Sequence, residues 1–556
     1  MTDTSSSIRV AATQFASTSV VDDNLDTCVR MIRTAAESSP DLIVLPEFCN
    51  HISVYDSADH CWAVALELDG RFLSTIAAEA QSAEAFVVLA VTLRHDDGTV
   101  TISNVMFDNG GNRVAISDKQ VLMGNERQYL TPGTSIGPII PSPFGPIAMY
   151  SCMEGVVFEP PRSLAIRGAR VMTNSLNSFG LDEASLHIPV RAAENRVFIV
   201  AANKVGPLIP AERVEAFAEA MGIPPASLDG AGESQIVSPD GTVLAIAPRT
   251  GEAVIYADID LANADSKVAA GGTDMHAARR PETYAPLGSR SADKPTVASK
   301  GKIIVTLGSS AHPTDIPQAD VVVLPELSGV SADPGADPED AVKQSERGVS
   351  GIAEHLSGRD GIVITTIVER LSDGLAHTAV AIGAEGLVAS QRQLHHSGRH
   401  PWATVLADAV ECQETPWGRY ALLAGDDVLF PEAFRLAAIQ GASVIFVSTH
   451  ILDPWLPTLG IPERAAENRV HVLASSRLQP GIGGVAAILP PDMTLWLPDR
   501  TRPFDGTINH PEVTAATNKW TTLTVAPHRS KNKLVSAGTD LVNGRPVEGA
   551  GTSLTV

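Results

Sequence analysis

The sequence of 556 residues is poor in cysteine, in aromatic side chains and in positive charge. Its five cysteines are an odd number with no zinc-type spacing, which argues against a disulfide framework. Asp and Glu outnumber Lys and Arg by 64 to 41, and the net charge of −23 disfavours nucleic acid and anionic membranes as partners. No stretch approaches the roughly 20 apolar residues of a bilayer span, and no basic segment followed by an apolar run opens the chain. These absences predict a soluble, cytoplasmic protein.

The chain contains one pattern twice. Residues 41–47 (DLIVLPE) recur as 320–326 (DVVVLPE), and 191–202 (RAAENRVFIVAA) recur as 464–475 (RAAENRVHVLAS), the second pair at an offset of 273 residues. Repeats of this length indicate a duplicated domain rather than a single large one. With 44% hydrophobic residues, the chain can bury a core in each copy.

The two copies extend from about residue 8 to 265 and from about 300 to 526, so we predict domains over 1–290 and 291–556. Short Val- and Ile-rich strands alternate with Ala-rich helical stretches in both, which predicts an α/β layered fold. Residues 210–222 predict an additional helix in the first copy, and we expect it to act as a lid or an interface element.

Cys152 is the cysteine best placed for chemistry. It follows a strand (GPIAMYS) and precedes a helix (EPPRSLAIRGA), and a thiol on such a turn is exposed at the edge of a sheet, near a helix N-terminus that stabilises a thiolate. A small buried hydrophobe is the alternative for Cys152 and the preferred interpretation for Cys28, Cys49, Cys61 and Cys412.

Three charged residues complete a candidate site. Glu47 ends an apolar strand, Lys119 ends another apolar stretch, and Glu126 follows seven residues later. Each could be a solvated charge, but together with Cys152 they suggest a thiol hydrolase without histidine. Glu47 would be the general base, Lys119 would stabilise the oxyanion, and Glu126 would orient Lys119 or the substrate nitrogen.

These motifs resemble the nitrilase superfamily of carbon–nitrogen hydrolases. The resemblance rests on LIVLPEF with Glu47, Lys119, the turn YSCMEG with Cys152, and the later blocks RAAENRVF and GESQIVSPDG. It implies two tandem αββα sandwich domains, a Glu-Lys-Cys site that acts through a thioester, and no cofactor or metal. Subunits of this family pair through helical faces, so the resemblance also implies an intrachain pseudo-dimer, with further self-association left open.

The second copy departs from this pattern where the chemistry would occur. At the offset of 273, Gly425 replaces Cys152, Arg392 replaces Lys119 and Arg399 replaces Glu126. Glu326, at an offset of 279, remains as the counterpart of Glu47. Without a thiol this mechanism cannot operate, so we expect the second half to be a pseudo-enzyme, with Asp426 and Asp427 as solvated carboxylates.

The sequence narrows the substrate only in part. The segment CMEG-x-x-FEPPR looks more like that of the amidase branches of this superfamily. This resemblance favours an amide or N-carbamoyl compound as the small-molecule partner, and a nitrile is the alternative. An N-acyltransferase and a non-catalytic binding protein are alternatives from other classes. We expect Tyr55, Asn174, Asn177 and His187 to contact substrate.

Overall fold

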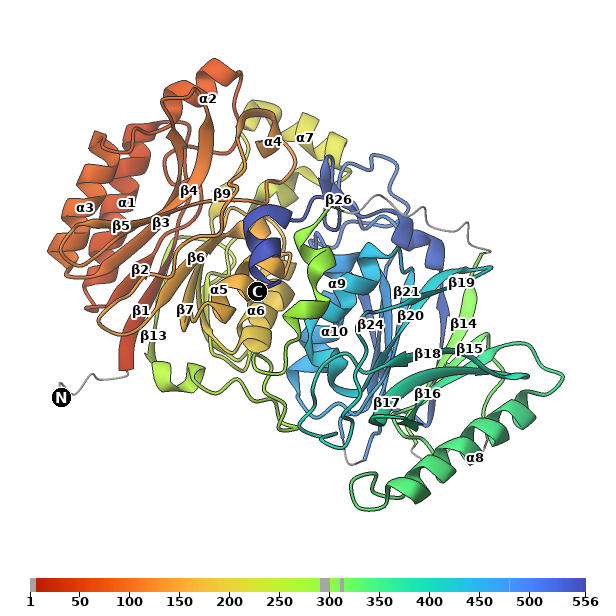
Figure 1. The fold of residues 1–556 in the computed structure, drawn as a ribbon. Coiled ribbons are helices and arrows are strands. Elements are labelled where there is room, and N and C mark those ends of the chain that lie inside the picture. Colours follow the sequence, from red (N-terminus) through yellow and green to blue (C-terminus); the bar gives the residue numbers. More distant parts are fainter. Residues whose placement is uncertain (1–6, 291–300, 311–314, 480) are drawn as a thin grey trace, which may run out of the picture.

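The computed structural model describes residues 7–290, 301–310, 315–479 and 481–556, and it contains two similar α/β halves side by side (Figure 1). Each half has two large sheets packed face to face. None of the described helices is long and apolar enough to cross a lipid bilayer.

The first half is an αββα sandwich. Its first sheet has the order β13-β1-β2-β3-β4-β5, and its second sheet has the order β12-β11-β8-β7-β6. The strands of the first sheet are β1 (Ser7–Gln14), β2 (Leu42–Val44), β3 (Phe86–Arg94), β4 (Val100–Phe107), β5 (Arg113–Asp118) and β13 (Ala253–Asp260). Those of the second sheet are β6 (Ile147–Ser151), β7 (Val171–Ser175), β8 (Phe198–Ala202), β11 (Gln235–Val237) and β12 (Val243–Ile246).

Successive side chains of a strand in the first sheet point alternately into two apolar layers, one between the two sheets and one under the outer helices. Val10 and Ala12 of β1 face the second sheet and meet Met149 of β6, whereas Ala11 faces the outer helices. The outer helices of the first sheet are α1 (Val21–Ala36) and α3 (Arg71–Ala83), and those of the second sheet are α5 (Glu159–Ile166) and α6 (Ile188–Asn195).

The second half repeats this architecture. Its sheets have the orders β18-β17-β16-β15-β14-β25 and β19-β20-β21-β22-β23-β24. The strands of the first of these are β14 (Ile303–Gly308), β15 (Val321–Val323), β16 (Ile362–Leu371), β17 (Gly374–Gly383), β18 (Gly386–Arg392) and β25 (Trp520–Val525). Those of the second are β19 (Cys412–Thr415), β20 (Gly418–Ala424), β21 (Val444–Ser448), β22 (His471–Ser475), β23 (Gly484–Ile488) and β24 (Glu512–Ala516).

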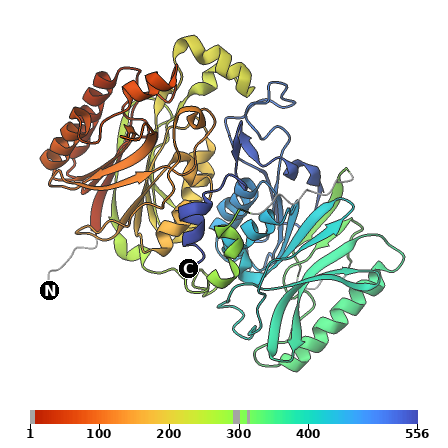
Figure 2. The same cartoon turned by 45° about the horizontal axis from the view of Figure 1, so that its top comes forward.

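Helices α9 (Pro431–Ile439) and α10 (Ile461–Asn468) lie between the second half's sheets and the first half, and α8 (Pro338–Leu356) covers the far side (Figure 2). The helical layers therefore follow one another in the order α1 with α3, α5 with α6, α9 with α10, and α8. The two sheets of the first half lie between the first and second of these layers, and the two sheets of the second half lie between the third and fourth. The two tandem sandwiches that the sequence predicted are present.

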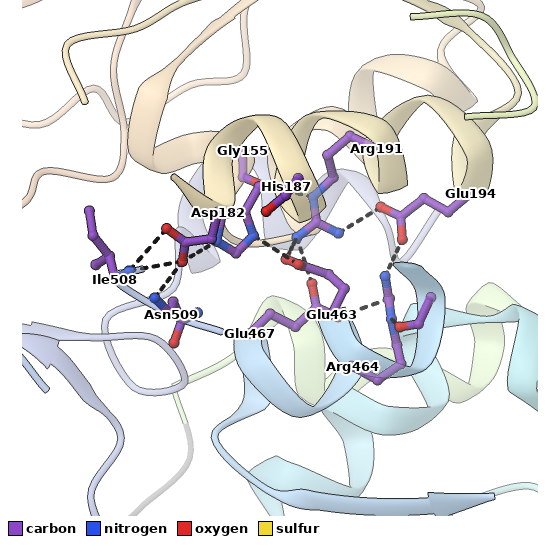
Figure 3. Close-up of polar contacts among 12 residues, drawn as sticks. Gly155, Asp182, His187, Arg191, Glu194, Glu463, Arg464, Glu467, Ile508 and Asn509 are labelled. Carbon is purple, nitrogen blue, oxygen red and sulfur yellow. Dashed lines mark hydrogen bonds and ion pairs between the residues drawn. The ribbon is translucent and has the colours of Figure 1, made fainter. Parts of the chain in front are cut away.

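The halves contact each other through reciprocal ion pairs. Arg162 on α5 pairs with Glu432 on α9 at 2.9 Å, and the repeat-related pair, Arg435 with Glu159, has the same distance. A second reciprocal set joins α6 and α10: Arg191 with Glu467 at 2.8 Å, and Arg464 with Glu194 (Figure 3). All of these side chains are buried. Residue i therefore contacts residue j of the other copy and j contacts i, as in a two-fold interface.

The segment that follows each copy packs on the opposite half. Met275, Tyr284 and Leu287, after the first copy, belong to the apolar core around α9. The C-terminal tail of the second copy reaches the first half, where Thr539 Oγ1 accepts the backbone N–H of Gly124 at 3.0 Å, and the C-terminus lies beside α5 (Figure 1). The connector that the sequence predicted between the copies thus packs against the second half. Its residues 291–300 lie outside the described part of the chain.

Candidate active site

The first half buries a cation between two carboxylates. Glu47 lies just after β2, and Lys119 just after β5, at the same end of the first sheet. Lys119 Nζ lies 2.8 Å from Glu47 Oε1 and donates to both carboxylate oxygens of Glu126 at 3.0 Å. Neither Glu47 nor Lys119 exposes its side chain to solvent. The structure thus brings together the three charged residues that the sequence selected.

Cys152 lies at the end of β6, on a strained turn. Its φ of +45° is in the left-handed region, and it opens a short 3-10 helix, Cys152–Gly155. Asn174 on β7 fixes the turn, because its Oδ1 accepts the backbone N–H of Cys152 at 2.8 Å. This geometry places a thiol at the carboxyl end of a strand, as a nucleophile on a strand-to-helix turn requires.

Glu154 joins the turn of Cys152 to the segment of Lys119, a role that the sequence did not predict. Its carboxylate accepts the backbone N–H of Ser151 and that of Gln120, both at 2.9 Å. Burial raises the pKa of Glu154 to about 7, against these two hydrogen bonds. The spacing Ser-x-x-Glu at 151–154, a capping box, was the available signal.

Burial controls the electrostatics of the site. It raises the pKa of Glu47 to about 7, although the charge of Lys119 opposes the shift. It also raises the pKa of the Cys152 thiol, an effect that Glu47 strengthens and Lys119 opposes. The pKa of Lys119 lies well above its ordinary value, because Glu126 and Glu47 outweigh desolvation. The resting site therefore favours a neutral thiol beside a carboxyl group that titrates near neutrality.

The four residues expected to contact substrate have different positions. Asn177 and His187 line a cavity that Cys152 also lines. His187 is held there by Glu463 of the second half at 2.8 Å and by Asp182 at 3.3 Å, which raise its pKa (Figure 3). Asn174 supports the backbone of the nucleophile, and Tyr55 packs in an apolar cluster with Phe48. Neither Asn174 nor Tyr55 lines this cavity.

The second half keeps the backbone of this site without its nucleophile. Gly425 has a φ of +53°, close to that of Cys152. Asp427 accepts the backbone N–H of Leu394 at 2.9 Å, just as Glu154 accepts that of Gln120 in the first half. A Cβ on Gly425 would lie 2.8 Å from His377 Cε1 and 2.9 Å from Gln393 Oε1. The space of a nucleophilic side chain is therefore filled.

The strand register corrects the counterpart of Lys119. The N–H of Gln393 donates to the carbonyl of His377, as that of Lys119 donates to Ile102, so Gln393 and not Arg392 takes the place of Lys119. Arg392 lies on the exposed side of its strand. Gln393 precedes Gly425 by 32 residues, whereas Lys119 precedes Cys152 by 33, so the second copy has one residue fewer between these positions and the offset of 273 fails at Lys119.

Arg399 supplies the cation of the second half. Its guanidinium pairs with Glu326 and, at 2.6 Å, with Asp426. The expectation of solvated carboxylates was wrong, because Asp426 and Asp427 are both buried and hydrogen-bonded. The charge of Arg399 holds the pKa of Glu326 and that of Asp426 below their ordinary values, against burial.

Glu326, His377 and His400 lie close enough together to hold a metal ion. Both ring nitrogens of His377 already have partners, Gln393 Oε1 at 2.8 Å and Thr366 Oγ1 at 2.7 Å. The carboxylate of Glu326 already forms an ion pair with the guanidinium of Arg399. A cation would have to displace these contacts, so the donor set does not favour a metal.

Comparisons with known proteins agree with this duplicated architecture. The profile of the carbon–nitrogen hydrolase family matches residues 9–267 and again 284–496. A nitrilase of Pyrococcus abyssi is 25% identical over 264 residues, which cover 47% of this chain and 93% of the relative. An N-carbamoylputrescine amidase of Solanum lycopersicum is 24% identical over 298 residues, covering 50% of this chain and 93% of the relative.

Among solved structures, a variant of the amidase of Nesterenkonia AN1, from the nitrilase superfamily, is 20% identical with a TM-score of 0.39. The match covers 46% of this chain and 92% of that one. These relatives thus match about half of the present chain over nearly their whole length.

Proposed function

Because this chain belongs to the carbon–nitrogen hydrolase family, we propose that its first half hydrolyses the C–N bond of a small amide or N-carbamoyl compound through a thioester on Cys152. The observation that carries the proposal is the buried ion pair of Glu47 and Lys119 beside a thiol on a strained turn. The second half has the same backbone but lacks this combination. Domain 1–290 is thus the catalytic unit and 291–556 a degenerate one.

The first chemical step forms the acyl-enzyme. Glu47, as carboxylate, takes the proton of the Cys152 thiol, and the sulfur attacks the carbonyl carbon. Lys119 Nζ and a backbone N–H of the following turn stabilise the negative oxygen of the tetrahedral intermediate. The proton on Glu47 passes to the leaving nitrogen, the C–N bond breaks, and ammonia or an amine departs.

The second step regenerates the thiol. Glu47 is again a carboxylate and takes a proton from water, whose oxygen attacks the thioester carbon. The C–S bond breaks, the thiolate regains the proton, and the acid product leaves. Glu126 keeps Lys119 in place during both steps, because its two oxygens lie 3.0 Å from Nζ.

A nitrile is the second candidate substrate, because one of the relatives is named a nitrilase. A screen for ammonia release across amides, N-carbamoyl compounds and nitriles distinguishes the bond types. We expect turnover of an amide or N-carbamoyl compound and its loss in Cys152→Ala. Activity that survives this substitution would contradict the thiol mechanism, and product that forms only with an added amine would identify an acyltransferase.

We also propose that the contact between the halves replaces the subunit contact of single-copy relatives. The reciprocal ion pairs of α5 and α6 with α9 and α10 support this. Deletion of residues 291–556 should then expose buried arginines and yield insoluble protein. A soluble and fully active fragment 1–290 would contradict the proposal that the second half replaces a partner subunit.

We further propose that the protein works in a reducing compartment such as the cytoplasm, because its five cysteines form no disulfide.

A further inference from the structure

Two adjoining cavities serve the candidate active site. Cys152 lines the inner cavity, and an outer cavity lies next to it. Met123, Glu126, Asn177 and Phe179 line both. A molecule bound at Cys152 can therefore extend from the inner cavity into the outer one.

Both halves of the chain supply the walls of these cavities. The first half contributes the segment around α7 (Val214–Met221), which contains the helix expected over 210–222. The second half contributes Ile508, Asn509 and Val535 to the inner cavity and Trp496 to the outer one. The half without a nucleophile thus forms part of the pocket of the other.

Apart from Val535, the contribution of the second half comes from a segment that its repeat partner lacks. Residues 489–511 join β23 to β24, whereas five residues, 238–242, join the corresponding strands β11 and β12 of the first half. The longer segment extends across the boundary between the halves, and its Leu495 and Ile508 pack with Met221 of α7 in one apolar cluster.

Buried polar contacts fix this segment over the site. The carboxylate of Asp182 accepts the backbone N–H of Ile508 at 2.9 Å and that of Asn509 at 2.5 Å (Figure 3). The N–H of Leu181 donates to the carbonyl of Gly506 at 2.9 Å. Asp182 is fully buried, so the segment is anchored as a wall with a defined position.

The outer cavity is mainly apolar, with Ser53, Asn125 and Asn177 as its uncharged polar residues. Its walls include Val54, Leu208, Ile209, Phe217, Met221, Leu228 and Trp496. Glu126 is the one charged residue among the described residues that line it, and Lys119 engages both of its carboxylate oxygens. A charged substituent would lose hydration there without gaining a free partner of opposite charge, whereas an apolar one would bind more strongly by about fourfold per buried methylene.

We propose that the substrate carries an extended, uncharged apolar acyl group, and that the second half selects this group through Trp496 and Ile508. The inference rests on the proposed C–N hydrolysis at Cys152. The acyl part stays on the sulfur through both chemical steps, so a fixed apolar wall stabilises it throughout, whereas the leaving amine departs after the first.

The test compares kcat/KM for acetamide, butanamide, hexanamide and 6-aminohexanamide, measured by ammonia release with the full-length protein. We expect hexanamide to exceed acetamide by at least about 50-fold, since four more methylenes are buried. We expect the charged amide to fall at least about tenfold below hexanamide. Trp496→Ala should lower the hexanamide-to-acetamide ratio at least about tenfold.

Phe217→Ala provides a second variant that removes a wall residue of the first half, should Trp496→Ala fail to fold. The matched control is Trp402→Ala, which removes a half-buried tryptophan of the second half that lies in a different apolar cluster and should leave the ratio unchanged. Equal turnover of acetamide and hexanamide, a preference for the charged amide, or an unchanged ratio in both wall variants would overturn the inference alone. No turnover of any amide would overturn the proposed function together with it.

Discussion

The turn after β6 in the first half and the turn after β20 in the second have nearly the same backbone but different chemistry. Cys152 and Gly425 have φ values of +45° and +53°. In the first half this turn holds a thiol beside Glu47 and Lys119. In the second half His377 and Gln393 fill the corresponding space, and Arg399 neutralises the remaining carboxylate, Glu326. The fold thus preserves the scaffold of an active site independently of its reactive groups.

The retained scaffold includes a carboxylate that is easily mistaken for a catalytic group. Glu154 and Asp427 both hold the backbone N–H of the segment from the neighbouring sheet. Because this carboxylate persists where the nucleophile is absent, its role is to position the turn. The comparison therefore separates residues that build the site from residues that react.

Exchanging the nucleophile between the halves gives the largest expected effect. Cys152→Gly should reduce kcat/KM by at least about 10⁴-fold, because no thioester can form. Adding Gly425→Cys to this variant should restore nothing, since His377 and Gln393 occupy the space and Gln393 stands at the position of Lys119. Ammonia release measures both variants. Recovered activity in the double variant would show that the second site is still competent.

Lys119→Gln gives the first half the residue that the second half carries at this position. We expect kcat/KM to fall by about 10³-fold, because the charge beside the oxyanion is lost. Steady-state kinetics, with circular dichroism as a check of folding, provide the measurement. A loss below about fivefold would contradict the assigned role of Lys119.

Arg399→Leu removes the corresponding cation of the second half. It should leave kcat/KM unchanged but lower the free energy of unfolding by about 3 kcal/mol, because Glu326 and Asp426 become buried without a partner. The control is Arg370→Leu, which breaks the exposed pair with Glu339 and should cost less than about 1 kcal/mol. Denaturant unfolding distinguishes them, and a large loss of activity in Arg399→Leu would contradict a purely structural second site.

The pH dependence of activity separates the two carboxylates Glu47 and Glu326. Burial raises the pKa of Glu47 to about 7, so kcat/KM should rise about tenfold per pH unit below 7 and level off above it. Arg399 lowers the pKa of Glu326, so Glu326→Gln should leave this inflection in place. An inflection near pH 4.5 in the unmodified protein would indicate a solvated base and contradict the assignment of Glu47.

The repeated motifs predicted the duplication, and the alternation of strands and helices predicted α/β layers. The two sandwiches followed only from the resemblance to the nitrilase superfamily, and the grouping of Glu47, Lys119 and Glu126 with Cys152 followed from their residue types and positions in the sequence. The sequence could not place Gln393 at the position of Lys119, because the second copy has one residue fewer between this position and that of the nucleophile, and the diverged sequence there does not show where. Nor did it show that Asp182 anchors Ile508 of the other half, since contacts between residues more than 300 positions apart leave no local pattern.

The most direct test of the account is to find which thiol carries the acyl group. The protein is mixed with an amide that it hydrolyses, quenched in acid within the turnover time, and its peptides are analysed by mass spectrometry. We expect an adduct with the mass of the acyl group on the peptide containing Cys152, and unmodified Cys28, Cys49, Cys61 and Cys412. An acyl group on another cysteine, or hydrolysis that continues in Cys152→Ala, would contradict the claim that the first half alone holds the nucleophile.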